Sequence, residues 1–365
     1  MKILADANMA GVEAYFSRLG DVSLFEGRTL ASEQLAEADV LLVRSVTPVN
    51  AALLGDHRLR FIGSATSGYD HVDRKLLANL DIPFAHAPGS NADSVVDYVL
   101  SVLCQHPTQL DALLGGSAIG IIGYGHIGRC LQTRLARLGI RSCSYDPWVE
   151  VATTDSLERV IECPVVSLHA ELTDKTPWPS RHMLTLQQLQ ALPRDALLIN
   201  AARGELIATE VLLALSDTRP DIGLVLDCWE REPAISNDLL RVCRFGTPHI
   251  AGYSADGKWR ATAMLYHAAC DALSTQVSAV PAALPPLDIE APSGLMADEL
   301  LPWLVGQVYD VREDDEALRR SPLLFDQLRK QYRQRRELRA LRLNNPALLD
   351  EAALSICTAL GVERC

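Results

Sequence analysis

Short apolar runs alternate with helical patterns through most of the chain, and this alternation predicts a parallel α/β fold. The runs are rich in Val, Ile and Leu on successive positions, which is typical of strands buried on both faces of a sheet. We predict strands at Ile3–Ala5, Asp39–Val43, Arg60–Gly63, Ser117–Ile122, Arg141–Tyr145, Val165–Leu168, Ala196–Asn200 and Ile222–Leu226. With helices between them, they form a doubly wound βα pattern.

Helical periodicity and proline content divide the rest of the chain. Residues 91–106 form a strong helical pattern, which we place between two domains. The stretch Val280–Gly294 contains four prolines and is predicted to be a linker. Beyond it, we predict helices at Leu323–Leu341, which is strongly basic, and at Asn345–Leu360. A charge run of this kind usually forms a solvated helix face.

Composition narrows the class of protein. A chain of 365 residues with 48% hydrophobic and 22% charged residues predicts two or three globular domains. No apolar run is long enough to span a bilayer and no signal peptide is expected, so we predict a cytoplasmic protein without a membrane partner. A net charge of −12 argues against nucleic acid as a partner. The nine cysteines lack zinc-site spacing, so we expect reduced core residues and no metal site.

A glycine-rich turn provides the clearest chemical signal. Gly123, Gly125 and Gly128 follow a predicted strand and open a predicted helix, and Asp146 ends the next strand. The glycines permit a tight turn, close approach of the pyrophosphate and close helix packing. The first helical residues, His126 and Ile127, supply backbone amides to the phosphates. The carboxylate of Asp146 suits the adenosine ribose and repels a 2′-phosphate, so the predicted cofactor is NAD.

Arg44, Ser45 and Thr66 follow two predicted strands in the N-terminal region. Ligands of open parallel sheets bind beyond the carboxyl ends of the strands, so these residues could contact a small anion. The alternative, which the sequence alone favours, is that Ser45 and Thr66 only cap the helices that follow.

Three later motifs each follow a predicted strand and contain Arg203, Glu232 and His249. Singly, each residue has an ordinary structural explanation. Together they provide what oxidation of a 2-hydroxy acid needs. An arginine can grip the carboxylate, a histidine can remove the hydroxyl proton, and a carboxylate can orient that histidine.

These motifs resemble the Arg, Glu and His signature of the D-isomer-specific 2-hydroxyacid dehydrogenases. The resemblance implies a Rossmann dinucleotide domain (93–255) inserted in a flavodoxin-like substrate domain (1–92 and 256–282). A small α+β C-terminal domain (286–365) is implied to form a homodimer.

The same resemblance implies further roles. The family glutamate directly precedes the proline, which selects Glu232 and not Glu230. Asp227 corresponds to a position near the nicotinamide, Gly252 to an NAD contact, and Ala170 to a threonine that touches NAD. Substrate-binding positions of the family correspond to Ser45, Thr66 and Tyr253, and Arg44 is a lower-ranked phosphate partner.

The basic tail narrows the resemblance, because lactate- and glycerate-type members lack it. It implies a phosphorylated four-carbon 2-hydroxy acid as substrate, in the route to vitamin B6. Two alternatives stay open: another enzyme of the family, such as one acting on 3-phosphoglycerate, or a non-catalytic NAD-sensing scaffold.

Overall fold

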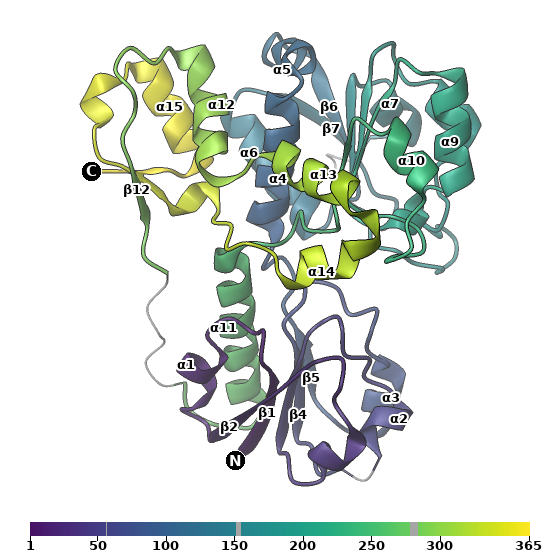
Figure 1. Cartoon of the computed structure of the whole chain (residues 1–365), viewed down its shortest axis with the longest axis vertical. Coiled ribbons are helices and arrows are strands. Elements are labelled where there is room, and N and C mark those ends of the chain that lie inside the picture. The colour runs from purple at the N-terminus through teal and green to yellow at the C-terminus, as the bar shows by residue number, and fades with distance from the viewer. Residues whose placement is uncertain (56, 151–154, 278–283) are drawn as a thin grey trace. The chain divides into compact units, whose positions relative to one another are not determined.

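The computed structural model describes residues 1–55, 57–150, 155–277 and 284–365, which form two compact units (Figure 1). One unit contains Met1–Asn91 and Ser254–Pro285, and the other contains Ala92–Tyr253 and Pro286–Cys365. The C-terminal region thus lies in the same unit as the predicted dinucleotide domain. Its status as a separate dimerisation domain stays a prediction. The predicted linker falls partly on residues outside the described ranges.

The first unit is built on a five-stranded parallel sheet with the order β2-β1-β3-β4-β5. Its strands are β1 (Lys2–Asp6), β2 (Asp21–Phe25), β3 (Val40–Val43), β4 (Phe61–Ser64) and β5 (Phe84–His86). Its helices are α1 (Val12–Phe16), α2 (Ala51–Leu54), α3 (Arg74–Asn79) and α11 (Ala255–Ala272). Successive strand residues alternate between two cores: Ile3 and Leu42 pack toward α1 and α11, whereas Leu41 packs on the other face with residues of α2 and α3.

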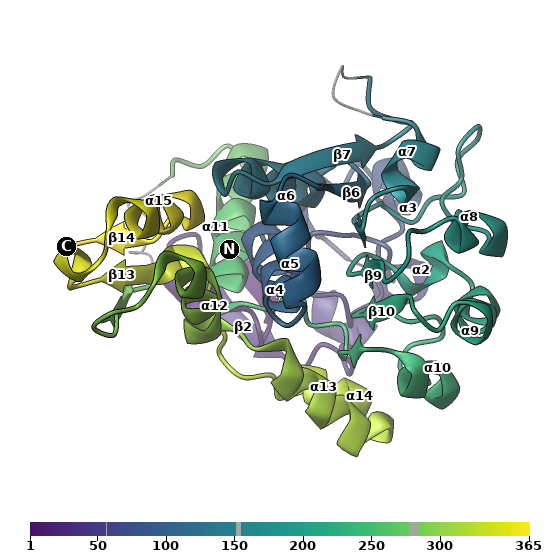
Figure 2. The ribbon, with the colours of Figure 1, turned by 90° about the horizontal axis from the view of Figure 1, so that it is seen from above.

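The second unit contains a six-stranded parallel sheet with the order β11-β10-β9-β8-β6-β7. Its strands are β6 (Ala118–Ile122), β7 (Arg141–Tyr145), β8 (Val165–Leu168), β9 (Leu197–Asn200), β10 (Gly223–Leu226) and β11 (Phe245–Gly246). Its helices before residue 254 are α4 (Ala92–Cys104), α5 (Pro107–Leu114), α6 (His126–Arg137), α7 (Leu157–Ile161), α8 (Leu186–Gln190), α9 (Thr209–Thr218) and α10 (Asn237–Val242). Figure 2 shows α4, α5 and α6 on one side of this sheet and α7 to α10 on the other, so the predicted doubly wound fold is confirmed.

The C-terminal region adds helices and a small parallel sheet, β12-β13-β14, to the second unit. Its elements are β12 (Leu287–Ile289), α12 (Ala297–Val308), α13 (Val311–Arg320), α14 (Phe325–Lys330), β13 (Leu341–Leu343), α15 (Glu351–Leu360) and β14 (Glu363–Arg364). Side chains of α12 and α15 share one hydrophobic core with α4 and α6. This region therefore extends the apolar core on the side of the six-stranded sheet where α4 and α6 lie.

The predicted helix over Leu323–Leu341 is wrong beyond Lys330. Helix α14 ends there, and the chain continues without regular structure until a short 3₁₀ turn at Leu338–Ala340. The prediction of a solvated face is also wrong for part of this run. Arg335 is only 2% exposed: its guanidinium lies 3.7 Å from the centroid of the Tyr309 ring and donates to Ser94 O at 2.6 Å. These partners, distant in sequence, hold the segment in an extended path.

A buried carboxylate fixes the same segment on α4. Asp97 accepts a hydrogen bond from Leu338 N at 2.9 Å, and Arg134 lies 3.9 Å from its other oxygen. Burial raises the pKa of Asp97 to about 7, although the nearby Arg134 and Arg335 charges oppose the change.

No helix among the described residues is long and apolar enough to cross a membrane.

Candidate active site

The glycine-rich turn connects β6 to α6 with the geometry that a dinucleotide loop requires. Gly123 has a φ of 99°, and a Cβ there would lie 2.4 Å from Ala170 N. A Cβ on Gly128 would lie 2.1 Å from Gly123 O, so helix and turn are in direct contact. A Cβ on Gly125 would meet nothing within 4 Å, which leaves the backbone open to a ligand. The predicted role of each glycine is therefore compatible with its surroundings.

The other predicted cofactor residues surround this turn. His126 and Ile127 are the first residues of α6, and Gly125, its N-cap, offers no side chain to the free amides. Asp146 directly follows β7, and its carboxylate accepts Tyr124 N at 2.8 Å and Trp148 N at 3.0 Å. Ala170 lies against Gly123. A helix N-terminus beside a carboxylate at the end of the next strand fits NAD, which carries a pyrophosphate and a ribose.

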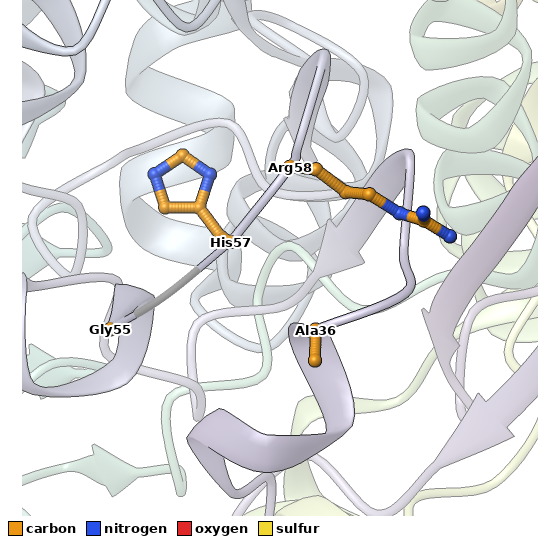
Figure 3. Close-up of a pocket in the computed structure, with 4 residues that line it drawn as sticks. All are labelled: Ala36, Gly55, His57 and Arg58. Carbon is orange, nitrogen blue, oxygen red and sulfur yellow. The ribbon is translucent and has the colours of Figure 1, made fainter.

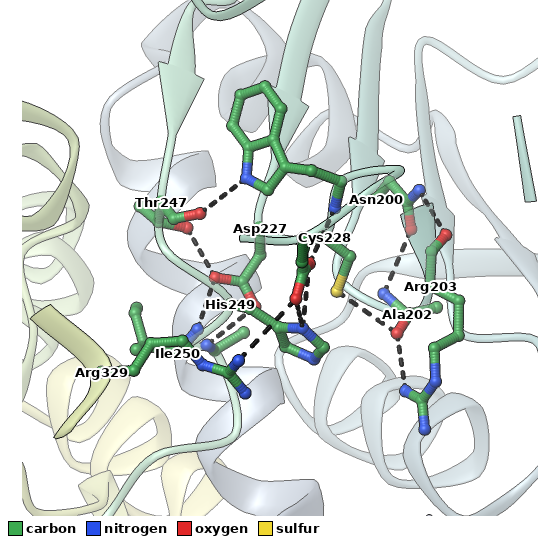
Figure 4. A network of polar contacts seen from close by, with 12 residues as sticks. Asn200, Ala202, Arg203, Asp227, Cys228, Thr247, His249, Ile250 and Arg329 are labelled. Carbon is green, nitrogen blue, oxygen red and sulfur yellow. Dashed lines mark hydrogen bonds and ion pairs between the residues drawn. The ribbon is translucent and has the colours of Figure 1, made fainter. Parts of the chain in front are cut away.

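Glu232 and His249 form the centre of a second polar cluster. Figure 4 shows the residues around His249. His249 Nδ1 lies 2.8 Å from Glu232 Oε2 and 3.0 Å from Oε1, and Trp229 N donates to Oε1 at 3.0 Å. Burial by itself raises the pKa of Glu232. The His249 ring, the Trp229 amide and the Arg329 guanidinium outweigh that effect and hold the pKa below its usual value. The carboxylate is thus ionised and directed at the imidazole.

Glu230, the rejected alternative, lies in another set of contacts. Its carboxylate pairs with His182 Nε2 at 2.7 Å and accepts Thr209 N at 2.6 Å. It therefore supports the loop before α9, and the choice of Glu232 as the neighbour of His249 agrees with the geometry.

Asp227 holds the loop that carries His249. Its two oxygens accept Ile250 N at 2.8 Å, Ala251 N at 2.9 Å and the Thr247 hydroxyl at 2.7 Å. His249 has a φ of 55°, an uncommon left-handed conformation that these bonds help to maintain. Burial raises the pKa of Asp227. Its structural role was not anticipated, and its predicted contact with the nicotinamide stays a prediction.

Arg203 follows β9 and is positioned by close backbone packing. A Cβ on the next residue, Gly204, would lie 2.0 Å from Trp229 C, so only glycine fits there. Arg203 donates to Ala202 O at 2.8 Å. In Figure 4 the His249 ring is drawn between the guanidinium groups of Arg203 and Arg329. The arrangement can present a cation and a base to one small acid.

Cys228 lies within the same cluster, where its Sγ, a Glu232 oxygen and a His249 nitrogen are within 4.8 Å of one another. Burial raises the pKa of Cys228 well above its usual value, and Sγ lies 3.3 Å from Ala202 O. A neutral thiol is a poor metal ligand, because thiolate is the binding form. The absence of a metal site stays a prediction.

The predicted substrate residues lie in both units. In the first, Arg44 follows β3 with Nη1 3.9 Å from Asp6 Oδ1, and Ser45 is exposed beside it. Thr66 follows β4 and lies 2.6 Å from the Ser64 hydroxyl. In the second, Tyr253 and Gly252 belong to the turn after His249.

The helix-capping alternative for Ser45 and Thr66 is wrong. Helix α2 is capped by Asn50, which accepts Leu53 N at 3.1 Å, and α3 by Asp73, which accepts Leu76 N at 3.0 Å.

A surface hollow in the first unit, shown in Figure 3, is lined by Ala36, Gly55, His57 and Arg58. None of the predicted site residues lines it, so it plays no part in the assignment.

Comparisons with known proteins assign the chain to a family. Residues 103–251 match the NAD binding domain of the D-isomer specific 2-hydroxyacid dehydrogenases, and residues 282–361 match a domain of unknown function. Erythronate-4-phosphate dehydrogenase of Cellvibrio japonicus is 41% identical over 99% of both chains. The chain belongs to the erythronate-4-phosphate dehydrogenase family. The enzyme of that name from Shewanella loihica is 41% identical over 95% of this chain and 96% of its own.

Solved structures of wider relatives share the fold. The 3-phosphoglycerate dehydrogenase of Entamoeba histolytica, bound to NAD⁺, has a TM-score of 0.62 and 22% identity, over 75% of this chain and 95% of its own. D-Lactate dehydrogenase of Aquifex aeolicus, complexed with NAD and lactic acid, has a TM-score of 0.61 and 21% identity, with coverage of 75% and 96%. By its family, this chain is an NAD-dependent oxidoreductase that acts on a CH–OH group.

Sequence reasoning missed several residues that form this site, above all Arg329, Thr247 and Trp229. Arg329 lies in the basic run, where nothing local distinguishes it from its neighbours.

Proposed function

We propose that the chain oxidises 4-phospho-D-erythronate with NAD to (R)-3-hydroxy-2-oxo-4-phosphooxybutanoate, a step in pyridoxine 5′-phosphate synthesis. The observation that supports it most is the pair of Glu232 and His249, whose Oε2 and Nδ1 atoms are 2.8 Å apart. Arg203 lies beside His249 in Figure 4, and the chain is 41% identical to an enzyme named for this substrate.

The proposed reaction gives each residue of the cluster a defined task. His249 donates Nδ1–H to Glu232, so its Nε2 is left to take the proton of the C2 hydroxyl. Glu232 stabilises the imidazolium that this transfer produces. Arg203 binds the C1 carboxylate and polarises the C2 oxygen as it becomes a carbonyl. Bound NAD would supply the acceptor for the hydride of C2.

Arg44 is proposed to bind the phosphate, together with Ser45 and Thr66. Lys258, on α11 of the same unit, supports this assignment. Burial, and then the charge of Arg44, lowers the pKa of Lys258 to about 8. Two half-buried cations that repel one another are stabilised when an anion binds beside both. Tyr253 is proposed as a further substrate contact.

A direct comparison of substrates tests this proposal. We expect NADH to form faster with 4-phospho-D-erythronate than with 3-phosphoglycerate or D-lactate, measured as kcat/KM at 340 nm. A preference for 3-phosphoglycerate would contradict the substrate assignment. Tight NAD binding with no turnover of any 2-hydroxy acid would favour the sensing scaffold.

Replacement of the base tests the mechanism. His249→Asn should lower kcat by about 10²–10⁴-fold, because proton removal belongs to the transition state. The dissociation constant for NAD, measured by fluorescence titration, should change less than about threefold. His182→Asn, which removes another histidine paired with a carboxylate, is the matched control and should keep its activity. Parallel losses of turnover and NAD binding in His249→Asn would refute a role as base.

We propose a homodimer in which the C-terminal region contributes the interface. Leu323 is 95% exposed, and Met296, Leu324 and Leu348 of the same region are exposed apolar side chains. A Leu323→Glu variant that stays dimeric in sedimentation would count against this face.

We also propose a cytoplasmic location, because the nine cysteines are all free thiols in the described residues, as a reducing compartment would keep them.

A further inference from the structure

Arg329, from helix α14 of the C-terminal region, lies against the paired carboxylate of the candidate active site. Its Nη1 is 3.8 Å from Glu232 Oε2, the oxygen nearest to His249 Nδ1. Its Nη2 donates to the Tyr253 hydroxyl at 3.3 Å, and its Cζ lies 5.8 Å from the centroid of the Tyr253 ring. One guanidinium thus contacts both the orienting carboxylate and a proposed substrate residue.

The helix that carries Arg329 is anchored before it. Phe325, at the start of α14, is fully buried in the core that covers one face of the six-stranded sheet. Asp315 accepts Gly246 N of β11 at 2.7 Å and pairs with Arg319 at 2.9 Å. Arg319 also donates to Leu240 O and Cys243 O. These contacts fix α13 and α14 on the second unit.

The chain after α14 is anchored on the loop that carries His249. The Tyr332 ring meets the Tyr253 ring edge-on at 5.8 Å, and the Tyr332 hydroxyl donates to Asp314 at 2.7 Å. Arg335 donates to Ala251 O at 3.4 Å. The chain is therefore anchored on both sides of Arg329, and these contacts fix the position of Arg329 beside Glu232.

The charges around the pair make Arg329 significant. Glu232 is 20% exposed and Arg329 19%, so water screens their attraction only partly. Asp227 adds a buried acid, Cys228 stays a neutral thiol, and Arg203 is the second cation of the cluster. A cation at Glu232 keeps the carboxylate ionised and makes uptake of a proton by the pair harder.

We infer that Arg329 is a positioning residue for the reaction: it holds Glu232 on His249 and sets the pH at which the pair can accept the substrate's proton. The inference rests on the proposed roles of Glu232 and His249. It gives the C-terminal region, which matches a domain of unknown function, a direct part in the candidate active site.

Charge removal at this position tests the inference. In Arg329→Met, the acid limb of kcat/KM for oxidation should move up by about 1 pH unit, and kcat should fall by about tenfold. Arg329→Lys keeps the charge and should keep the limb within about 0.3 pH unit. Arg320→Met, which removes an exposed arginine paired only loosely with Glu316 at 3.8 Å, is the matched control and should match the parent enzyme.

A measurement without substrate separates this inference from the proposed function. The ring proton signals of His249, assigned by their loss in His249→Asn, are followed by NMR against pH in the NAD-free protein. Their midpoint should rise in Arg329→Met by the same amount as the acid limb, even if 4-phospho-D-erythronate were not the substrate. Arg329→Gln, which keeps a donor to Tyr253 without charge, replaces the Met variant if that variant does not fold. An unchanged midpoint, or a loss confined to substrate KM, would overturn the inference.

Discussion

The glycine-rich turn and the C-terminal basic segment (Phe325–Leu338) both serve the candidate active site, yet they are built in opposite ways. The turn depends on local backbone: Gly123 needs its positive φ, and Gly128 touches Gly123 directly. The basic segment depends on distant partners, since Arg329 meets Glu232 and Arg335 meets Ser94. The first design can be recognised in a short sequence window, and the second cannot.

The largest expected effect concerns the glycine-rich turn, which depends on local backbone. Gly123→Ala should lower the free energy of unfolding by about 3 kcal/mol or more and abolish measurable NAD binding, because a Cβ at φ 99° would lie 2.4 Å from Ala170 N. Thermal unfolding and fluorescence titration with NADH measure both. Gly125→Ala, where a Cβ meets nothing within 4 Å, is the control. It should unfold within about 0.5 kcal/mol of the parent protein and lose only affinity for NAD. Equal destabilisation of the two variants would show that the turn is not built as described.

A somewhat smaller effect is expected in the basic segment, which depends on partners distant in sequence. Arg335→Met should cost about 2–3 kcal/mol of unfolding free energy, because it leaves Ser94 O and Ala251 O without this donor and removes the contact with the Tyr309 ring. Urea unfolding gives the value. Lys330→Met, in the same basic run, provides the comparison and should cost less, since Lys330 is exposed. If both changes cost the same, the segment is held by its general charge and not by Arg335.

The smallest effect sharpens the comparison through pH. The pKa of Asp97 is raised to about 7 in the folded chain, against 3.8 for the free group. Between these values the folded state binds the extra proton, so this carboxyl makes stability fall as pH rises from about 4 to 7. In Asp97→Asn, which still accepts Leu338 N, that contribution should disappear. The difference in melting temperature between Asp97→Asn and the parent protein should therefore grow in favour of the variant from pH 5 to pH 8. A difference that is constant with pH would contradict a buried, titrating Asp97.

Much of the fold could be predicted from the sequence, because parallel strands buried on both faces appear as apolar runs. The strands at Arg141–Tyr145 and Val165–Leu168 have the predicted bounds. β2 and β5 were missed, since the exposed and half-buried positions of Asp21–Phe25 and Phe84–His86 break the apolar pattern. The sequence thus predicts strands that form continuous apolar runs, and it does not predict edge strands whose apolar pattern is interrupted.

The candidate site divides in the same way. Arg203, Glu232 and His249 could be proposed because each follows a strand and together they match a family signature. The tasks of Asp227 and Arg329 could not, because their partners are decided by tertiary packing. Asp227 holds the turn of His249, and Arg329 reaches Glu232 across nearly a hundred residues of chain. A run of similar arginines does not reveal which member is buried.

The position of Arg329 well after Glu232 and His249 in the chain has a consequence for biosynthesis. Domains generally begin to fold from the N-terminal side while the rest of the chain is still being made. The nucleotide turn and the loop of His249 leave the ribosome well before residue 329. Until then Glu232 and His249 lack the cation that α14 brings. A nascent chain can therefore form its nucleotide-binding turn first, and completes the candidate site only after α14 has been made.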